Sequence, residues 1–286
     1  MAAVLGTNMA SVWASKNLQT AQSNMASTVE RLSSGLRINR ARDDAAGLAV
    51  ANNLTQQINS SNQGIRNIND GISMVQTTEG AIAAASEMAQ RVLTLATQGS
   101  NSSLTADQFD VIAKEMQSLW ASIGQIETRT QFSGATLLGA TGSVTIQGSG
   151  ISGDTFTISH TTALADIHVS ASGATDPGEL YHVINAAQSS PDATKMQAVV
   201  GKVDDYISYL DTQRATLGAL QNQMEYAVNN ITELSANLTA ARSRIIDADY
   251  AAETSDLTKG QILQQAATAM LAQANQMPNV ILSLLK

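Results

Sequence analysis

Apolar residues recur at helical spacing over residues 4–32 of this chain. They lie mostly three, four or seven positions apart, with Ser, Asn, Gln and Thr between them: Leu5, Met9, Val12, Leu18, Met25, Val29 and Leu32. The segment SSG at residues 33–35 breaks the pattern, and Asp43 or Asp44 can cap a new helix. The pattern predicts an amphipathic helix with no packing partner inside its own segment.

Three further stretches keep the 3.5-residue spacing of a coiled coil. The first covers residues 45–97 and has one continuous seam: Leu54, Ile58, Ile65, Ile68, Ile72, Val75, Ile82 and Ala89. After a turn at residues 99–103, the second covers residues 105–127, with an apolar face made of Phe109, Ile112, Met116, Leu119 and Ile123. The third lies near the far end of the chain: Val203, Ile207, Leu210, Leu217, Met224, Val228, Ile231, Leu238 and Ile245. Because a long helix with such a seam needs partners, we expect both arms of the chain to meet in one bundle.

A last amphipathic helix is expected over residues 255–285, after residues 247–250 interrupt the heptad pattern. Its apolar face consists of Leu257, Ile262, Leu263, Met270, Leu271, Val280, Leu284 and Leu285. Pro278 should bend this helix or interrupt it locally. Since neither terminal helix has an evident internal partner, we expect both to stay frayed in a lone molecule.

The middle of the chain, residues 140–190, is rich in Gly, Ser and Thr. It contains the short alternating stretches SVTIQ, DTFTIS and DIHVS, which are typical of strands. The segment GELYHVINAAQ adds a short helix, and Pro191 is expected to begin the returning long helix. The fold class is therefore mainly α: a long antiparallel coiled-coil-like helical bundle made by both chain ends, with a small β-rich inserted domain.

Composition narrows the classes of function. The chain is 43% hydrophobic, yet only 3% aromatic and 14% charged, with a formal net charge of −8. A surface with so few charges suits a protein that packs against copies of itself. The acidic balance, without a basic stripe, argues against nucleic acid as a partner. No run approaches the roughly 20 apolar residues of a membrane span, so no membrane insertion is expected.

The amino end argues against a cleaved signal peptide, and the absence of cysteine excludes cysteine chemistry. Residues 1–18 lack the basic start, continuous apolar stretch and cleavage site of a signal peptide. Export from the cell would therefore use a route that reads no cleaved signal. With no cysteine, the chain has no disulfide framework, thiolate nucleophile or cysteine metal site.

Few residues suggest chemistry. His160, His168 and His182 lie in the insertion with Asp166 nearby, but no zinc motif accompanies them, so we expect surface histidines and no metal site. The acidic pairs Asp43–Asp44 and Asp247/Asp249 stand at breaks between helices, where Asp caps backbone N–H groups. The stretch GSGISG is not followed by the Lys-Ser/Thr of a phosphate-binding loop. We expect no catalytic site and no cofactor.

Two long segments carry a family resemblance. The stretch TVERLSSGLRINRARDDAAGLAVANNL resembles the amino-terminal region of bacterial flagellins, and residues 237–286 resemble their carboxyl terminus. The stretch RTQFSGATLLG is similar to the family's exit into its variable region. The resemblance covers residues 1–139 and 194–286. It implies five segments: a filament-core helix and connector (1–43), bundle helices (44–139), a short outer insertion (140–190), a bundle helix (191–246) and a second filament-core helix (247–286).

The resemblance implies a non-enzymatic subunit, secreted to the flagellum, that polymerises with many copies of itself into the swimming filament. The residues expected to serve self-assembly in the filament core are Leu5, Met9, Val12, Leu18, Ile262, Leu263, Met270, Leu271, Leu284 and Leu285. An export chaperone on the C-terminal helix, a filament cap and hook–filament junction proteins are the implied partners.

The family is also detected by the animal Toll-like receptor 5. The matching positions are Arg91, Leu95 and Glu115, but Leu93 and Thr94 occupy places where strongly detected relatives carry an Arg-Glu pair. Three alternatives stay open. The chain could be a hook–filament junction protein, a flagellin-like surface protein that binds a ligand in its insertion, or an enzyme housed there, although Phe156 and Tyr181 are nearly the insertion's only aromatic residues.

Overall fold

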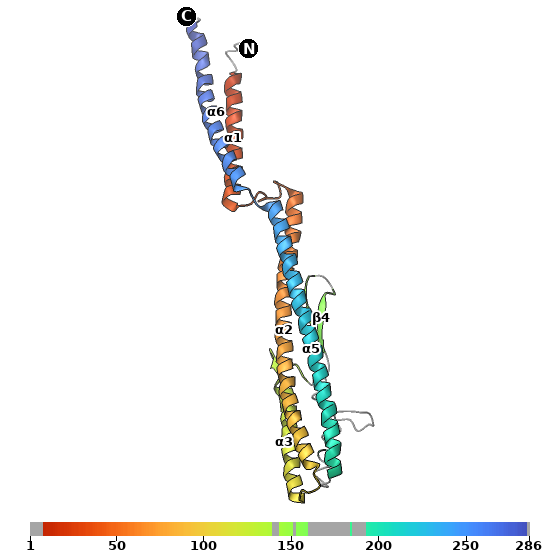
Figure 1. Cartoon of the computed structure of the whole chain (residues 1–286). Helices are drawn as coiled ribbons and strands as arrows, with labels where there is room; N and C mark the ends of the chain where they lie inside the picture. Colours follow the sequence, from red (N-terminus) through yellow and green to blue (C-terminus); the bar gives the residue numbers. More distant parts are fainter. Residues whose placement is uncertain (1–7, 139–142, 151–152, 160–183, 185–192, 285–286) are drawn as a thin grey trace. The chain divides into compact units, whose positions relative to one another are not determined.

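The computed structural model describes residues 8–138, 143–150, 153–159, 184 and 193–284, which are mainly helical (Figure 1). The chain divides into two compact units. One, the terminal unit, comprises Met1–Ile58 and Ala236–Lys286, and the other, the bundle unit, comprises Asn59–Ser235. The long helices α2 (Ala45–Gly99) and α5 (Ala193–Ile246) contribute to both.

The bundle unit is built from α2, α3 (Ala106–Arg129) and α5, which share one apolar core. The predicted seams supply this core: Ile68, Val75 and Ile82 from α2, Phe109, Met116 and Ile123 from α3, and Val203, Leu210 and Met224 from α5 are all buried. Trp120 of α3 meets Tyr206 of α5 edge to face, with ring centroids 5.3 Å apart. The predicted three-helix bundle is therefore confirmed, and its first and third helices come from opposite ends of the chain.

Polar side chains set the helix starts, as expected from the acidic residues at the breaks. Asp44 accepts a hydrogen bond from the Gly47 N–H at 2.8 Å at the start of α2, and Asp249 accepts from the Ala251 N–H at 2.9 Å at the start of α6 (Tyr250–Leu284). Thr105 and Gln108 form a reciprocal capping box at the start of α3. Asp43 also bonds backbone, accepting from the Arg40 N–H at 3.0 Å. This hydrogen bond is the main reason that the pKa of Asp43 lies below its ordinary value.

Two small antiparallel hairpins follow α3. The first pairs β1 (Gln131–Phe132) with β2 (Ala135–Thr136), and the second pairs β3 (Ser143–Gln147) with β4 (Thr155–Ser159). The second hairpin confirms the predicted strands in SVTIQ and DTFTIS. Its Ile146 and Ile158 side chains are buried. The DIHVS stretch, the three histidines and the GELYHVINAAQ segment apart from Ile184 lie outside the described residues.

The β3–β4 hairpin lies on a face of α2 that carries Ser60, Gly64, Asn67 and Gly71. A Cβ on Gly64 would collide with the backbone of Gly148, so only glycine permits this approach. One helical turn further along, the Asn67 amide donates a hydrogen bond to the Gln147 carbonyl at 3.1 Å. Gly71 leaves room for the Ile146 side chain. The two glycines of α2 therefore fix the hairpin against the bundle.

Replacing Gly64 with Ala should displace this hairpin, because the collision involves backbone that cannot rotate away. Amides of β3 and β4 should then exchange with solvent faster in hydrogen-exchange measurements. Gly80→Ala is the matched control, since a Cβ there meets nothing within 4 Å and should stabilise the helix by about 0.5–1 kcal/mol. Unchanged hairpin protection in the Gly64 variant would contradict this account.

The terminal unit contains α1 (Met9–Ser34) and α6 (Tyr250–Leu284), which lie side by side and run antiparallel (Figure 1). At one end of the pair, the Asn8 amide donates to the Ala274 carbonyl at 2.7 Å. At the other, the Tyr250 hydroxyl donates to the Leu32 carbonyl at 3.2 Å. The expectation that each terminal helix lacks an internal partner is therefore wrong, because each is the other's partner. α6 also runs unbroken through residue 278, so the proline does not end it.

The connectors next to this pair are joined by backbone hydrogen bonds. α1 ends at Gly35, whose φ of 71° is left-handed and whose N–H donates to the Arg31 carbonyl. Leu36 pairs with Asp247 in an antiparallel bridge. Arg37 donates from its N–H to the Ile246 carbonyl at 2.7 Å and from its guanidinium to the Ile245 carbonyl at 2.6 Å. The connectors thus hold the beginning of α6 close to the end of α1.

Candidate functional site

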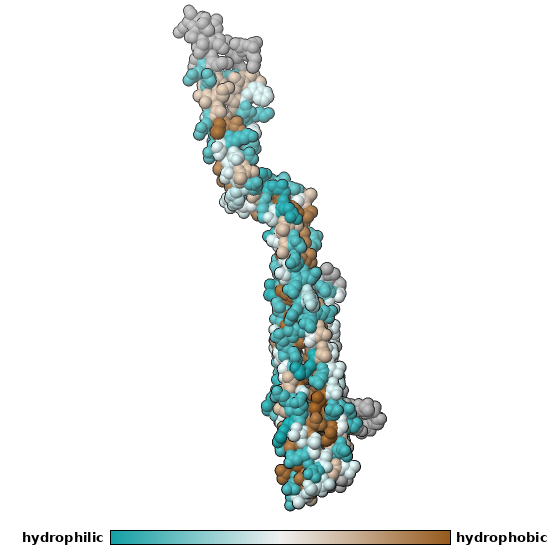
Figure 2. Space-filling view, viewed as in Figure 1, coloured by the Kyte–Doolittle hydropathy of each residue, from teal (hydrophilic) through white to brown (hydrophobic). Residues whose placement is uncertain are grey.

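The terminal pair exposes many large apolar side chains, and Figure 2 shows apolar residues on its surface among hydrophilic ones. Large side chains that are about half exposed or more on α1 and α6 are Met9, Val12, Trp13, Val29, Tyr250, Ile262, Leu263 and Met270. Single exposed apolar residues are normal, but a cluster of them marks an interaction surface. We call this set the terminal apolar surface.

The structure sorts the residues predicted for self-assembly into two groups. Met9, Val12, Ile262, Leu263 and Met270 belong to the terminal apolar surface. Leu18 and Leu271 are only partly exposed, because each falls at a heptad position of the seam between α1 and α6. The side chains of Leu5, Leu284 and Leu285 lie outside the described residues.

The fully buried positions of the seam are mostly small residues. Ala14 and Ala21 of α1 and Ala274 of α6 are buried, and Gly260 lies opposite Met25. Side chains this small bury little apolar area. The pairing of α1 with α6 therefore buries small residues fully and Leu18 and Leu271 partly, and it leaves most of the other large apolar side chains at the surface.

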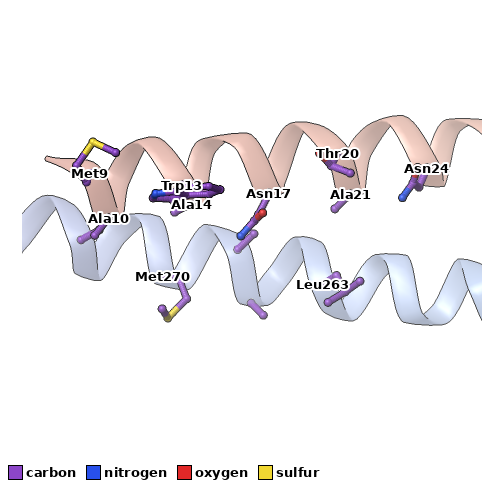
Figure 3. A pocket seen from close by; sticks show the side chains of 13 residues that line it. Met9, Ala10, Trp13, Ala14, Asn17, Thr20, Ala21, Asn24, Leu263 and Met270 are labelled. Atoms are coloured by element: carbon purple, nitrogen blue, oxygen red, sulfur yellow. The ribbon is translucent and has the colours of Figure 1, made fainter.

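A groove of about 700 Å³ runs along the two helices (Figure 3). Its lining holds no charged residue: Met9, Ala10, Trp13, Ala14, Asn17, Thr20, Ala21, Asn24, Leu263, Ala266, Ala267, Met270 and Ala274. Trp13 is 57% exposed, and the Lys16 ammonium lies 5.5 Å from its ring centroid. The sequence analysis did not select Trp13, although a Trp on an amphipathic helix of a chain with 3% aromatic residues was an available signal.

One ion pair at the connector end of the terminal pair joins a buried carboxylate to a partly exposed guanidinium. The Arg31 guanidinium lies 3.3 Å from the Glu253 carboxylate, and Glu253 is only 8% exposed. A buried carboxylate is costly without a cation, so Arg31 compensates it. This pair ties α1 to α6 beside the connectors and fixes their alignment.

The proposed receptor positions separate in the structure. Arg91 of α2 and Glu115 of α3 form an exposed ion pair, with 2.7 Å between guanidinium and carboxylate. Leu95 lies in the bundle core and is 2% exposed. A partner that approaches this face would therefore meet the ion pair and not the Leu95 side chain.

Metal-ligating side chains are not clustered in the part of the chain that the structure describes. That part contains no group of three or more His, Cys, Asp or Glu side chains placed to hold a metal ion. Burial, with the Glu127 charge, raises the pKa of Tyr206 far above its ordinary value, so this hydroxyl stays neutral. None of the described helices has the length and apolarity to cross a membrane.

Comparison with known families agrees with the two helical arms. The family model of the bacterial flagellin N-terminal helical region matches residues 5–143. The model of the bacterial flagellin C-terminal helical region matches residues 200–285. Both terminal helices and most of the bundle lie inside these two matches.

Individual relatives match along their whole length. A flagellin of Halalkalibacterium halodurans is 37% identical, covering 99% of this chain and 100% of the relative. The flagellar filament 33 kDa core protein of Treponema phagedenis is 36% identical with the same coverage. A solved structure from Vibrio parahaemolyticus, described as a flagellar hook-associated protein, shares the fold with a TM-score of 0.62 and 15% identity, covering 72% of this chain and 100% of that one.

Proposed function

This chain belongs to the bacterial flagellin family and is a structural subunit of the flagellar filament, and we propose that its terminal apolar surface drives polymerisation. We assign the chain to the filament and not to the hook–filament junction. The reason is that the relatives matched over their full length include a flagellin and a flagellar filament core protein. The likeness to a hook-associated protein concerns the fold alone.

The observation that carries this proposal is the exposure of large apolar side chains on α1 and α6 despite their pairing. Ile262 and Met270 are each 61% exposed, and Trp13 is 57% exposed. Covering the exposed half of one such side chain contributes about 1 kcal/mol. A neighbouring subunit that covers several of them gains enough free energy to hold the assembly. Residues 1–43 and 247–286 would then form the filament core.

A filament requires contacts that do not close into a ring, so each subunit needs two different patches. The terminal pair offers them, because Val12 and Ile262 are exposed but do not line the groove. Residues 44–139 and 191–246 would form the next shell, and the insertion at residues 140–190 would face outward.

Export precedes assembly in this proposal. An export chaperone would bind the C-terminal helix in a helix-in-groove mode, covering Ile262, Leu263 and Met270. The same side chains would then be unavailable to other subunits until release outside the cell. The filament cap and the hook–filament junction proteins would be the neighbours at the two ends of the polymer.

Detection by an animal receptor would use the exposed ion pair of Arg91 and Glu115. An exposed pair of this kind contributes little to stability, so either residue can be replaced without unfolding the bundle. Wild type should activate receptor reporter cells, and the Arg91→Ala variant should not. That difference would support this role.

Seeded polymerisation tests the main proposal. The purified, heat-depolymerised chain is mixed with short filament seeds or ammonium sulfate and examined by negative-stain electron microscopy. We expect long filaments with wild type and a strongly raised critical concentration with Met270→Ser. Filaments of the Met270 variant at the wild-type critical concentration would remove this residue from the assembly surface.

A further inference from the structure

The methionine side chains of this chain differ sharply in exposure. The sequence has ten methionines and no cysteine, so thioethers are its only sulfur groups. Met9 and Met270 are 52% and 61% exposed, and the side chains of Met1 and Met277 lie outside the described residues. Four others are buried in the bundle core: Met74, Met116, Met196 and Met224. An oxidant in solution therefore meets Met9 and Met270 before the core methionines.

The two exposed methionines belong to one surface. Both line the groove of the terminal pair, Met9 from α1 and Met270 from α6 (Figure 3). No charged residue lines this groove, and its polar members are Asn17, Thr20 and Asn24. An apolar surface of this kind stabilises a contact by leaving water. A reaction that makes either thioether polar therefore weakens any contact that covers the groove.

We propose that Met9 and Met270 form a reversible oxidation site, at which hydrogen peroxide converts both thioethers to sulfoxides and thereby prevents assembly. The selectivity for these two residues is independent of the proposed function. The effect on assembly rests on the proposed function and adds a chemical control to it.

The reaction balances with peroxide as the two-electron oxidant. A lone pair of the methionine sulfur attacks one peroxide oxygen, so an S–O bond forms while the O–O bond breaks. The departing hydroxide takes the proton of the transferred oxygen and leaves as water, and the thioether becomes a sulfoxide. Methionine sulfoxide reductases reverse the change, because two thiols are oxidised to a disulfide and the sulfoxide oxygen leaves as water.

A sulfoxide changes the groove because its oxygen accepts hydrogen bonds and the group has no donor. A neighbour that covers the groove would bury this oxygen among apolar side chains. An acceptor that is buried without a partner lowers an association constant by about 10-fold. Met9 and Met270 stand on different helices, so their effects should add. Oxidation of both should raise the critical concentration of polymerisation by about 100-fold.

The same oxidation should spare the bundle. Its four core methionines are each 7% exposed or less, so peroxide reaches them only when the bundle opens. The midpoint of thermal unfolding of the bundle should therefore stay unchanged after oxidation has stopped assembly. This contrast separates control of a surface from general oxidative damage to the fold.

Peptide mass spectrometry and seeded polymerisation together test the proposal. The dilute wild-type chain is treated with graded amounts of hydrogen peroxide, quenched, mapped for sulfoxides and then mixed with seeds. Sulfoxides at Met9 and Met270 should appear before those of the core methionines, and the critical concentration should rise with them. Treatment with the two reductases, one for each sulfoxide epimer, should return it to within about 3-fold of its starting value.

Leucine variants show whether these two residues carry the effect. Leucine keeps the size and apolarity of methionine but cannot be oxidised by peroxide. Each variant is compared with itself before and after treatment. The critical concentration of the Met9→Leu, Met270→Leu double variant should not change with peroxide. The matched control is the double variant Met25→Leu, Met88→Leu, which replaces partly exposed methionines outside the groove and should stay as sensitive as wild type.

Three results would overturn this inference and leave the proposed function intact. They are oxidation of the core methionines as fast as Met9 and Met270, normal polymerisation of a chain that carries both sulfoxides, and peroxide sensitivity that persists in the Met9→Leu, Met270→Leu variant. Failure of the untreated wild type to polymerise would instead count against the proposed function. The order of oxidation would still test the site in that case.

Discussion

Deletion of residues 255–286 should abolish polymerisation and leave the bundle folded. The deletion removes most of α6, including Ile262, Leu263 and Met270, whereas the core of the bundle unit comes from α2, α3 and α5. Losing three contacts of about 1 kcal/mol each corresponds to more than a hundredfold in critical concentration. Electron microscopy with seeds should show no filaments at about ten times the wild-type critical concentration.

Circular dichroism supplies the control for this deletion. The truncated chain should keep a cooperative helical unfolding transition, and deletion of residues 1–32 should behave in the same way because it removes the other half of the pair. If either truncated chain forms normal filaments, the terminal helices do not drive assembly.

Replacement of Trp120 with Ala destabilises the bundle by about 3–5 kcal/mol, the usual cost of truncating a buried aromatic side chain. The side chain is 3% exposed and packs edge to face on Tyr206, so its loss leaves a cavity between α3 and α5. For a unit of this size, the midpoint of thermal unfolding should fall by about 10 °C.

The second tryptophan is the matched control for this substitution. Trp13→Ala removes the same side chain from an exposed position on α1, so the unfolding transition of the bundle should not move. The two variants should therefore differ in opposite ways, one in stability and the other in assembly. A similar loss of stability in both would contradict the division of the chain into a bundle unit and a terminal unit.

The bundle was predictable because its seam is made of large apolar residues at regular spacing. Ile68, Met116 and Leu210 are each visible as heptad positions, and each is buried. The pairing of α1 with α6 was not predictable in the same way. The residues that are fully buried in its seam include Ala14, Ala21 and Ala274, which a search for large apolar side chains passes over. The large residues that such a search selects are mostly the ones left exposed.

The candidate site also contains some residues that could be predicted from the sequence and others that could not. Met9, Ile262 and Met270 were selected as an apolar face and are exposed as a self-assembly surface requires. Leu95 was proposed as a receptor contact because of its position in the family resemblance. In the structure its side chain is buried in the bundle core. Trp13 was missed because a groove depends on the packing of two helices from opposite ends of the chain. The docking of β3–β4 on Gly64 was hidden for the same reason, since it depends on backbone approach.

The contact between Asn8 and Ala274 joins residues 266 positions apart, almost the full chain. Closing so long a loop in an unfolded chain costs about 5 kcal/mol for its length alone. The α1–α6 seam fully buries no large apolar side chain among the described residues, so it gains too little to offset that cost first. We therefore expect folding to begin in the bundle, which brings α2 and α5 together and leaves only the short connectors to be ordered. The terminal pair then forms last and opens first, so a subunit can lose and regain its assembly surface while its bundle stays folded.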